Sequence, residues 1–160
     1  MGIDTAKVTG RRQLRFETPE DLMRDVERLV AAERGGTLTR CGNWTLGQAL
    51  GHLAAWVDYA FDGYPMKPPP WLIRVIVRFS KNKFVHDRMP RGVRIPGIEG
   101  GTKATEVIST DEGVARLERA WGRLRASKPT QKSPIFGAMT HEEWIGLNLR
   151  HAELHLGFFK

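Results

Sequence analysis

Residues 140–159 have the sequence THEEWIGLNLRHAELHLGFF, and this stretch decides the fold. Thr140 followed three residues later by Glu143 is a capping-box pattern, in which each side chain can bond the backbone N–H of the other residue at the start of a helix. Apolar residues then recur every three or four positions, as on the buried side of an amphipathic helix. They are Trp144, Ile145, Leu149, Ala152, Leu156 and Phe159. The stretch therefore predicts a helix with one apolar side.

Three further stretches combine a capping signal with the same spacing. They begin at Thr18-Pro19-Glu20-Asp21, Thr45-Leu46-Gly47-Gln48 and Ser109-Thr110-Asp111-Glu112, and they are expected to end near Arg34, near Asp62 and before Pro129. Between the second and third lies a long connection, 64–108, whose apolar run 71–79 fits a strand or a short helix; we choose the helix. Four amphipathic helices with one long crossover connection predict an all-α fold, a four-helix bundle in which any strand is accessory.

The size and composition of the chain are those of one soluble domain, residues 1–160. It has 160 residues, of which 41% are hydrophobic and 27% are charged. A chain of this size can bury roughly 70% of the surface that it exposes when unfolded. It therefore needs no metal to complete its core, and any metal site would be functional.

Cysteine content and apolar segments indicate the cellular compartment. Cys41 is the only cysteine, which excludes an intrachain disulfide and a cysteine-rich zinc cluster. The first residues contain no apolar signal segment. The longest apolar run, 71–79, is interrupted by Arg74 and Arg78 and is too short to cross a bilayer. These features predict a cytoplasmic protein without a membrane partner.

The positive charge of the chain is local. Nine Lys/Arg and two acidic residues lie between Lys67 and Lys103, a surplus equal to the net charge of +7 of the whole chain. This basic segment fits a solvated loop, an anion-attracting rim that includes Arg88 and Arg91, or a nucleic-acid surface. The last is disfavoured, because no helix-turn-helix pattern is present and only two phenylalanines near the charges are available to stack on bases.

His151 and His155 stand four residues apart in the last expected helix. At 100° per residue they are separated by about 40° around the axis, so both rings point the same way and can reach one metal ion. Arg150 and Glu153 lie largely on the other side. His52 lies on the inward side of the second expected helix. The three histidines predict a site for one divalent ion; a surface pair and hydrogen-bonded core histidines are the alternatives.

Two further sequence features near these histidines are weaker indications of function. The string HAELH at 151–155 is not the zincin motif H-E-x-x-H, because Glu153 lies about 200° around the helix from His151 and cannot act as that motif's general base. Gln48, Tyr59 and Asn148 are candidates to contact the outer N–H groups of metal-bound histidines. As ordinary helix residues they would have no such role.

The segments TLGQALGHL (45–53) and FGAMTHEEWIGLNLRHAELHLGFF (136–159) resemble the DinB/YfiT-like superfamily and, within it, a bacterial branch of unknown function. The likeness extends through AKVTGRRQLRFET (6–18) and covers nearly the whole chain. The superfamily pattern is one histidine in the second helix and H-x-x-x-H in the last, around a divalent metal in a four-helix bundle. His52, His151 and His155 stand at the matching positions. The resemblance further implies a homodimer, and relatives that are metal- and thiol-dependent transferases and isomerases or hydrolases.

Two functions are compatible with these features. The first is a metalloenzyme of thiol-dependent transferase or hydrolase type that acts on a small, anionic molecule. Its cofactors would be zinc, nickel, iron or manganese and a low-molecular-weight thiol. The second is a non-catalytic metal-binding or dimerisation module.

Overall fold

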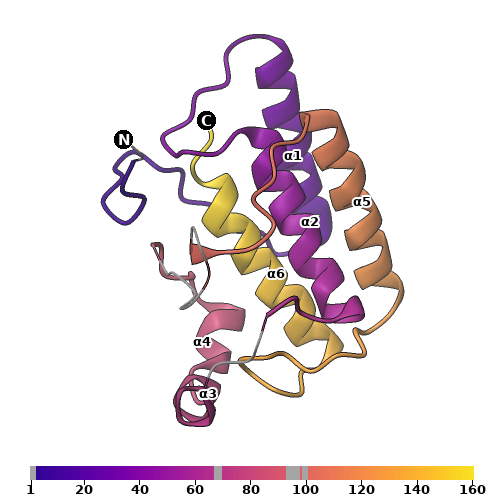
Figure 1. Ribbon diagram of the computed structural model, residues 1–160. Coiled ribbons are helices and arrows are strands. Elements are labelled where there is room, and N and C mark those ends of the chain that lie inside the picture. Colours follow the sequence, from indigo (N-terminus) through magenta and orange to yellow (C-terminus); the bar gives the residue numbers. More distant parts are fainter. Residues whose placement is uncertain (1–2, 67–69, 93–97, 99–100) are drawn as a thin grey trace.

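The computed structural model describes residues 3–66, 70–92, 98 and 101–160, and these are largely helical (Figure 1). The helices are α1 (Pro19–Arg34), α2 (Leu46–Asp62), α3 (Trp71–Arg78), α4 (Lys81–His86), α5 (Thr110–Ala126) and α6 (His141–Leu156). In the described ranges, β structure is limited to two isolated bridges, Arg40 with Phe159 and Ser133 with Gly137. The predicted all-α class is confirmed.

The four longer helices begin where their capping signals predict. Capping boxes are formed at the start of α1, α2 and α6 by Thr18, Thr45 and Thr140. At the start of α5, Ser109 accepts a hydrogen bond from the N–H of Glu112. These bonds satisfy N–H groups that a helix start would otherwise leave unpaired.

The last helix ends earlier than expected, at Leu156. The residues after it leave the helix and pair with the segment that precedes α2. Cys41 N–H donates to the Phe158 carbonyl at 2.9 Å, and Lys160 N–H donates to the Thr39 carbonyl at 2.9 Å. Tertiary hydrogen bonds thus end α6 at a point that its apolar spacing does not mark.

The connection between α2 and α5 contains two short helices. The apolar run forms α3, so the choice of a helix over a strand is confirmed, but α4 was not expected from the sequence. α4 packs against α6, where Val85 is buried close to Gly146. Within the described ranges, no helix has both the length and the apolarity that crossing a membrane requires.

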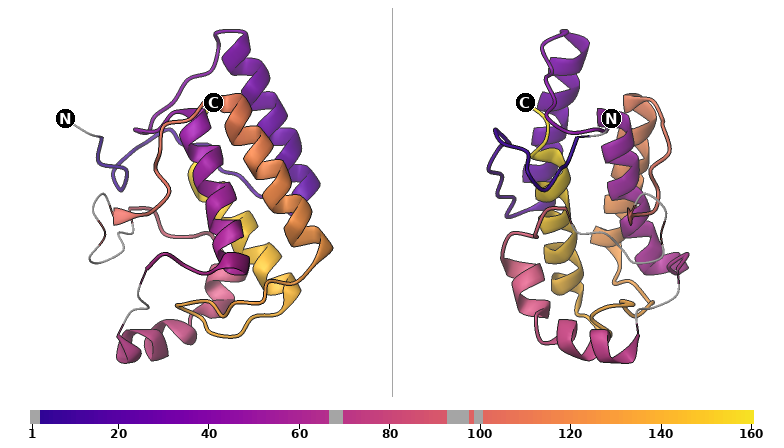
Figure 2. Two further views of the ribbon diagram at one scale, coloured as in Figure 1. Left: turned by 45° about the vertical axis from the view of Figure 1, so that its right-hand side comes forward. Right: turned by 60° about the vertical axis from the view of Figure 1, so that its left-hand side comes forward.

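The four longer helices contribute to one core, and α2 packs along α5 (Figure 2). Side chains buried almost completely come from each of them: Leu22 and Leu29, Leu50 and Val57, Leu117 and Leu124, and Trp144 and Leu156. The apolar sides that the sequence spacing indicates on the four longer helices therefore all contribute to the core.

Two glycines allow the chain to approach α2 closely. A Cβ atom on Gly47 would overlap the carbonyl oxygen of Ile108, and it would lie 2.8 Å from that of Ser109. A Cβ on Gly113, in α5, would lie 2.9 Å from the carbonyl oxygen of Gly47. Since real Cβ atoms do not approach oxygens so closely, glycine at these positions sets the distance between α2 and the start of α5.

The side of α6 opposite the histidines is covered by the N-terminal segment. Arg150 and Glu153 are 3% and 6% exposed and form an ion pair of 2.9 Å. Glu153 Oε1 accepts the Phe16 N–H at 2.6 Å, and Arg150 donates to the Phe16 carbonyl. Helical phase places both residues away from His151, as expected, but it gives no sign that another part of the chain buries them.

Replacing Gly47 with Ala should lower the free energy of unfolding by roughly 1–3 kcal/mol, because the added methyl group has no room beside the backbone. Gly122→Ala in α5 is the matched control, since nothing outside its own chain neighbours and helix backbone lies within 4 Å of its Cβ position. Removing a helical glycine there should instead stabilise the protein by about 0.5–1 kcal/mol. Urea unfolding followed by circular dichroism measures both, and equal shifts would contradict the close approach.

Candidate metal centre

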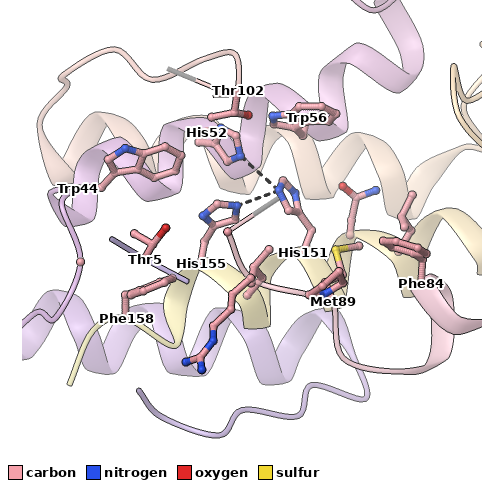
Figure 3. Close-up of a pocket in the computed structure, with 18 of the residues that line it drawn as sticks. Thr5, Trp44, His52, Trp56, Phe84, Met89, Thr102, His151, His155 and Phe158 are labelled. Carbon is pink, nitrogen blue, oxygen red and sulfur yellow. Dashed lines mark hydrogen bonds between the residues drawn. The ribbon is translucent and has the colours of Figure 1, made fainter. Parts of the chain in front are cut away.

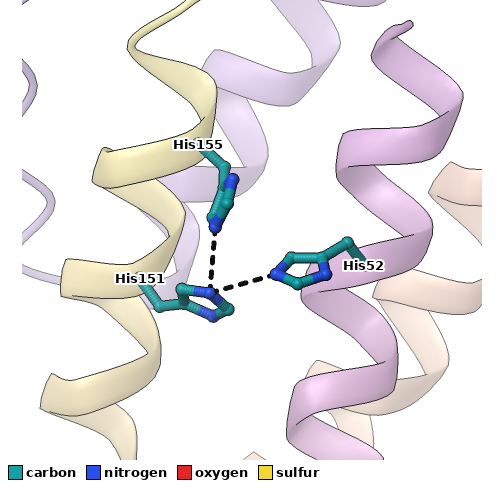
Figure 4. Close-up of side chains that lie close together, drawn as sticks. All are labelled: His52, His151 and His155. Carbon is teal, nitrogen blue, oxygen red and sulfur yellow. Dashed lines mark hydrogen bonds between the residues drawn. The ribbon is translucent and has the colours of Figure 1, made fainter. Parts of the chain in front are cut away.

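His52 from α2 and the pair His151 and His155 from α6 point toward one another (Figure 4). One ligand atom from each of the three lies within 4.8 Å of the others. His151 Nε2 is 3.2 Å from His52 Nε2 and 3.0 Å from His155 Nε2. The predicted proximity of the three histidines is therefore confirmed.

Helix phase and packing place these rings. His151 and His155 stand one turn apart on one side of α6, and α2 presents His52 to that side. All three histidines line one cavity; His52 is 1% exposed, and His151 and His155 are partly exposed. The group thus lies between core and solvent.

A backbone carbonyl orients His52. Its Nδ1 lies 2.9 Å from the carbonyl oxygen of Lys103, in the segment that leads to α5. A carbonyl oxygen only accepts, so Nδ1 carries the proton and Nε2 of the neutral ring carries a lone pair. This arrangement, in which the outer nitrogen bonds to an acceptor, is usual for metal-binding histidines.

The three Nε2 atoms cannot satisfy one another by hydrogen bonding. An N–H on His151 Nε2 can point at His52 or at His155, but not at both. If His151 Nε2 instead accepts a proton from His155, it meets the lone pair of His52 with no proton between them. In either case two nitrogens are in contact without a directed N–H. A cation among the three lone pairs removes this conflict, so the donor set fits a metal ion.

Burial keeps these rings neutral at neutral pH. It lowers the pKa of His52 to about 4, partly opposed by the hydrogen bond to Lys103. Burial and the nearby imidazole of His52 lower the pKa of His151 well below its usual value. His155 has a similarly lowered pKa, from burial first and from the other two imidazoles next. Neutral imidazole is the form that binds metals.

The backbone that holds His52 adopts an unusual conformation. Ala104, next to Lys103, has a φ of 56°, in the left-handed region that residues other than glycine seldom adopt. Such strain persists only where surrounding contacts hold it, and it is often found at functional sites. Here two contacts with α2 hold the segment, from His52 to Lys103 and from Gln48 Nε2 to the Thr105 carbonyl at 3.2 Å.

Aromatic side chains surround the histidines and line a cavity of about 680 Å³ (Figure 3). Trp44 stacks on His155, with 5.1 Å between the ring centroids and 5° between the planes. Trp56 stands edge-on to His151, at 5.6 Å and 74°. Sequence reasoning did not single out Trp44, Trp56 or the Lys103 carbonyl. Neither a tryptophan nor a backbone carbonyl marks a metal site in a sequence.

The three residues expected near the outer N–H groups differ in their surroundings. Gln48 Oε1 accepts the Thr45 N–H in the capping box of α2. Tyr59 contacts the rings of Trp56 and Tyr64. Only Asn148 lines the cavity with the histidines, and its amide donates to the Trp144 carbonyl at 2.9 Å. Among the described residues none of the three forms a hydrogen bond with His52, His151 or His155.

The two arginines of the expected anion rim also differ. Arg91 lines the cavity, and its Nη1 donates to the Val8 carbonyl at 2.7 Å. Arg88 bonds to Gln13 and is not among the residues that line the cavity. Lys67 and Arg94, two other charges of the basic segment, lie outside the described residues. Among the described residues of the basic segment, Arg91 is the cation that lines the cavity, and Lys103 contributes its backbone carbonyl to His52.

The metal-free protein should lose stability as the pH falls below about 6.5, the pKa of histidine in an unfolded chain. Folded His52 takes up a proton only near pH 4. Between these values the unfolded chain binds more protons, so the free energy of unfolding decreases with falling pH. The loss from His52 alone should reach about 2 kcal/mol at pH 5. Urea unfolding between pH 7.5 and pH 5 checks this, and His52→Gln should flatten the dependence.

Comparison with known proteins shows the family of this chain. The model of the DUF1569 family, described as a protein of unknown function, matches residues 8–160. No curated protein and no solved structure gives a significant match. The matched region contains the six helices of the described residues and the three histidines. Because the match covers nearly the whole chain, the protein belongs to the DUF1569 family.

Proposed function

We propose that this protein binds one divalent metal ion with His52, His151 and His155. The proposal is carried by one observation: the Nε2 atoms of the three histidines lie together, and the two contacts that His151 Nε2 makes cannot both be hydrogen bonds. Imidazole ligands suit zinc, nickel and iron, whereas manganese prefers oxygen ligands. Of the four metals expected from the sequence, the first three fit this donor set better.

We further propose that the site is catalytic, of thiol-dependent transferase or hydrolase type. A metal with three protein ligands keeps a coordination position open, where it supplies Lewis acidity and lowers the pKa of a bound water or thiol. The chain's own groups would orient and shield: Lys103 holds the ring of His52, and Trp44 covers one face of His155. The thiol itself is proposed on the family resemblance alone.

The DinB/YfiT-like relationship is part of the same proposal. It is supported by four longer helices with the long connection between the second and third of them, and by histidines on α2 and α6. In that interpretation α3 and α4 are additions within the connection. The four-helix bundle expected from the sequence would then be the scaffold of the metal site.

Replacing His151 with Ala should remove most of the bound metal, because it takes away one of three ligands. The metal affinity should fall by more than the roughly 10–100-fold that changes outside the ligand set produce. Metal analysis of untagged protein gives the occupancy, and a competition titration gives the affinity. His141→Ala is the matched control, since this histidine of α6 lies outside the cluster and contacts the Leu124 carbonyl.

The fold should survive the loss of the ion, since the core is formed by side chains of all four longer helices. Native-like circular dichroism of His151→Ala with the metal lost supports the proposal. Unfolding on chelation would make the metal structural, and full occupancy in the variant would contradict the ligand assignment. Screening the metal-loaded protein with thiol cofactors and with ester and amide substrates then separates an enzyme from a non-catalytic metal protein.

A further inference from the structure

The cavity beside the histidines has the size and lining of a small-molecule site. Its volume of about 680 Å³ lies within the range of roughly 300–1,000 Å³ that is usual for ligand pockets. Aromatic side chains are prominent in the lining, and they include Trp44, Trp56, Tyr64, Phe84, Phe136 and Phe158. Such walls suit a ligand with a flat, apolar body.

One polar group in this wall lacks a partner. The Nε1 atom of Trp56 is buried and has no hydrogen bond in the described part of the chain. Buried donors are nearly always paired, so an unpaired one requires an explanation. The indole lies beside the metal site, with its centroid 5.8 Å from that of His52 and 5.6 Å from that of His151. Figure 3 shows its nitrogen on the side of the ring that faces His52.

The charges near the cavity favour an anionic ligand. Among the described residues, the charged side chains along the lining are Arg91 and Asp4, whose charges offset each other. Neutral histidines with a divalent ion would add positive charge. An indole N–H only donates, so its partner must be an acceptor.

We propose that the cavity binds an aromatic carboxylate or a similar anion, with its ring among the aromatic side chains and its acceptor group between the metal and the Trp56 N–H. This inference rests on the proposed metal site and specifies its ligand class. Trp56 is then a specificity-determining residue, because its N–H can form a hydrogen bond only with a ligand that carries an acceptor beside the metal.

Cobalt(II)-loaded protein titrated with benzoate and with acetate, followed by visible absorption, tests the proposal. Benzoate should bind more tightly than acetate, because its ring fills the aromatic part of the cavity. Trp56→Phe keeps an aromatic ring but removes the N–H, and it should weaken benzoate binding about tenfold or more. Trp121→Phe is the matched control: this buried tryptophan of α5 does not line the cavity, so benzoate affinity should stay unchanged.

The outcomes separate the two proposals. If cobalt does not bind, the metal site is wrong and this inference is wrong with it. If cobalt binds to wild type and Trp56→Phe alike, but benzoate affinity is equal in both, the metal site stands and the role of Trp56 is overturned. Equal affinities for acetate and benzoate would overturn the aromatic ligand class.

A second inference comes from α3, which carries none of the three histidines. Five large apolar side chains of α3 and its C-terminal neighbour are 45–88% exposed: Trp71, Leu72, Val75, Ile76 and Phe79. We call these five the α3 face. On another side of the helix Val77 packs against the core. Exposed apolar groups gathered in this way usually mark an interaction surface.

The charges around the α3 face indicate the kind of partner. Arg74, Arg78 and Lys83 are exposed and form no ion pair within the described ranges. α3 and α4 contain no acidic residue. A second copy docked on the same face would bring like charges together. An anionic lipid surface has an apolar region that can accept the exposed side chains and negative headgroups that attract the basic ones.

We propose that the α3 face binds to the surface of an anionic phospholipid membrane. The sequence argued against a membrane partner only through the absence of a spanning segment, and a helix lying on the surface needs none. Tryptophan, phenylalanine and leucine beside arginine are the composition of such interfacial helices.

Co-sedimentation with phosphatidylcholine vesicles, with and without phosphatidylglycerol, measures this binding. Wild type should sediment with the anionic vesicles, and Ile76→Ser combined with Phe79→Ser should weaken binding about tenfold or more. Val107→Ser is the control, because Val107 is 76% exposed and lies outside the α3 face. Equal binding to both kinds of vesicle, or none, would overturn the proposal. A dimer in sedimentation equilibrium that the double variant abolishes would assign the face to a second copy instead.

Discussion

The close passage of the chain over α2 is the constraint on which the site depends. Glycine at position 47 lets the backbone of Ile108 and Ser109 lie against the helix. The segment before them stays on α2, where the Thr105 carbonyl accepts from Gln48 and the Lys103 carbonyl accepts from His52. The direction of the His52 ring, and therefore the meeting of three Nε2 atoms, follows from a backbone contact five residues earlier in α2.

Local chemistry explains why much of the fold could be predicted. Capping boxes and apolar spacing depend on residues three or four apart, so Thr45 and Thr140 mark helix starts wherever the helices later pack. The spacing of His151 and His155 predicts their shared direction for the same reason. His52 was placed on the inward side of its helix by the apolar residues around it, and the family resemblance strengthened the expectation that it meets the other two histidines.

Features that depend on distant backbone were not predictable. A carbonyl such as that of Lys103 exists at every residue, so no side chain marks it as the partner of His52. The left-handed Ala104 lacks the glycine that would signal its conformation. Arg150 and Glu153 are of residue types that usually face water, and only the path of residues near Phe16 buries them. Each depends on a contact between segments far apart in sequence.

The energetics of the three imidazoles favour a role in metal binding over a role in folding. Buried groups with unsatisfied polar contacts stabilise a core less than apolar groups of the same shape. Their lowered pKa values also make the metal-free fold sensitive to acid. The same lowering keeps protons from competing with a cation for the lone pairs at neutral pH. The property that weakens the metal-free protein is therefore the one that would favour the proposed binding of a metal by His52, His151 and His155.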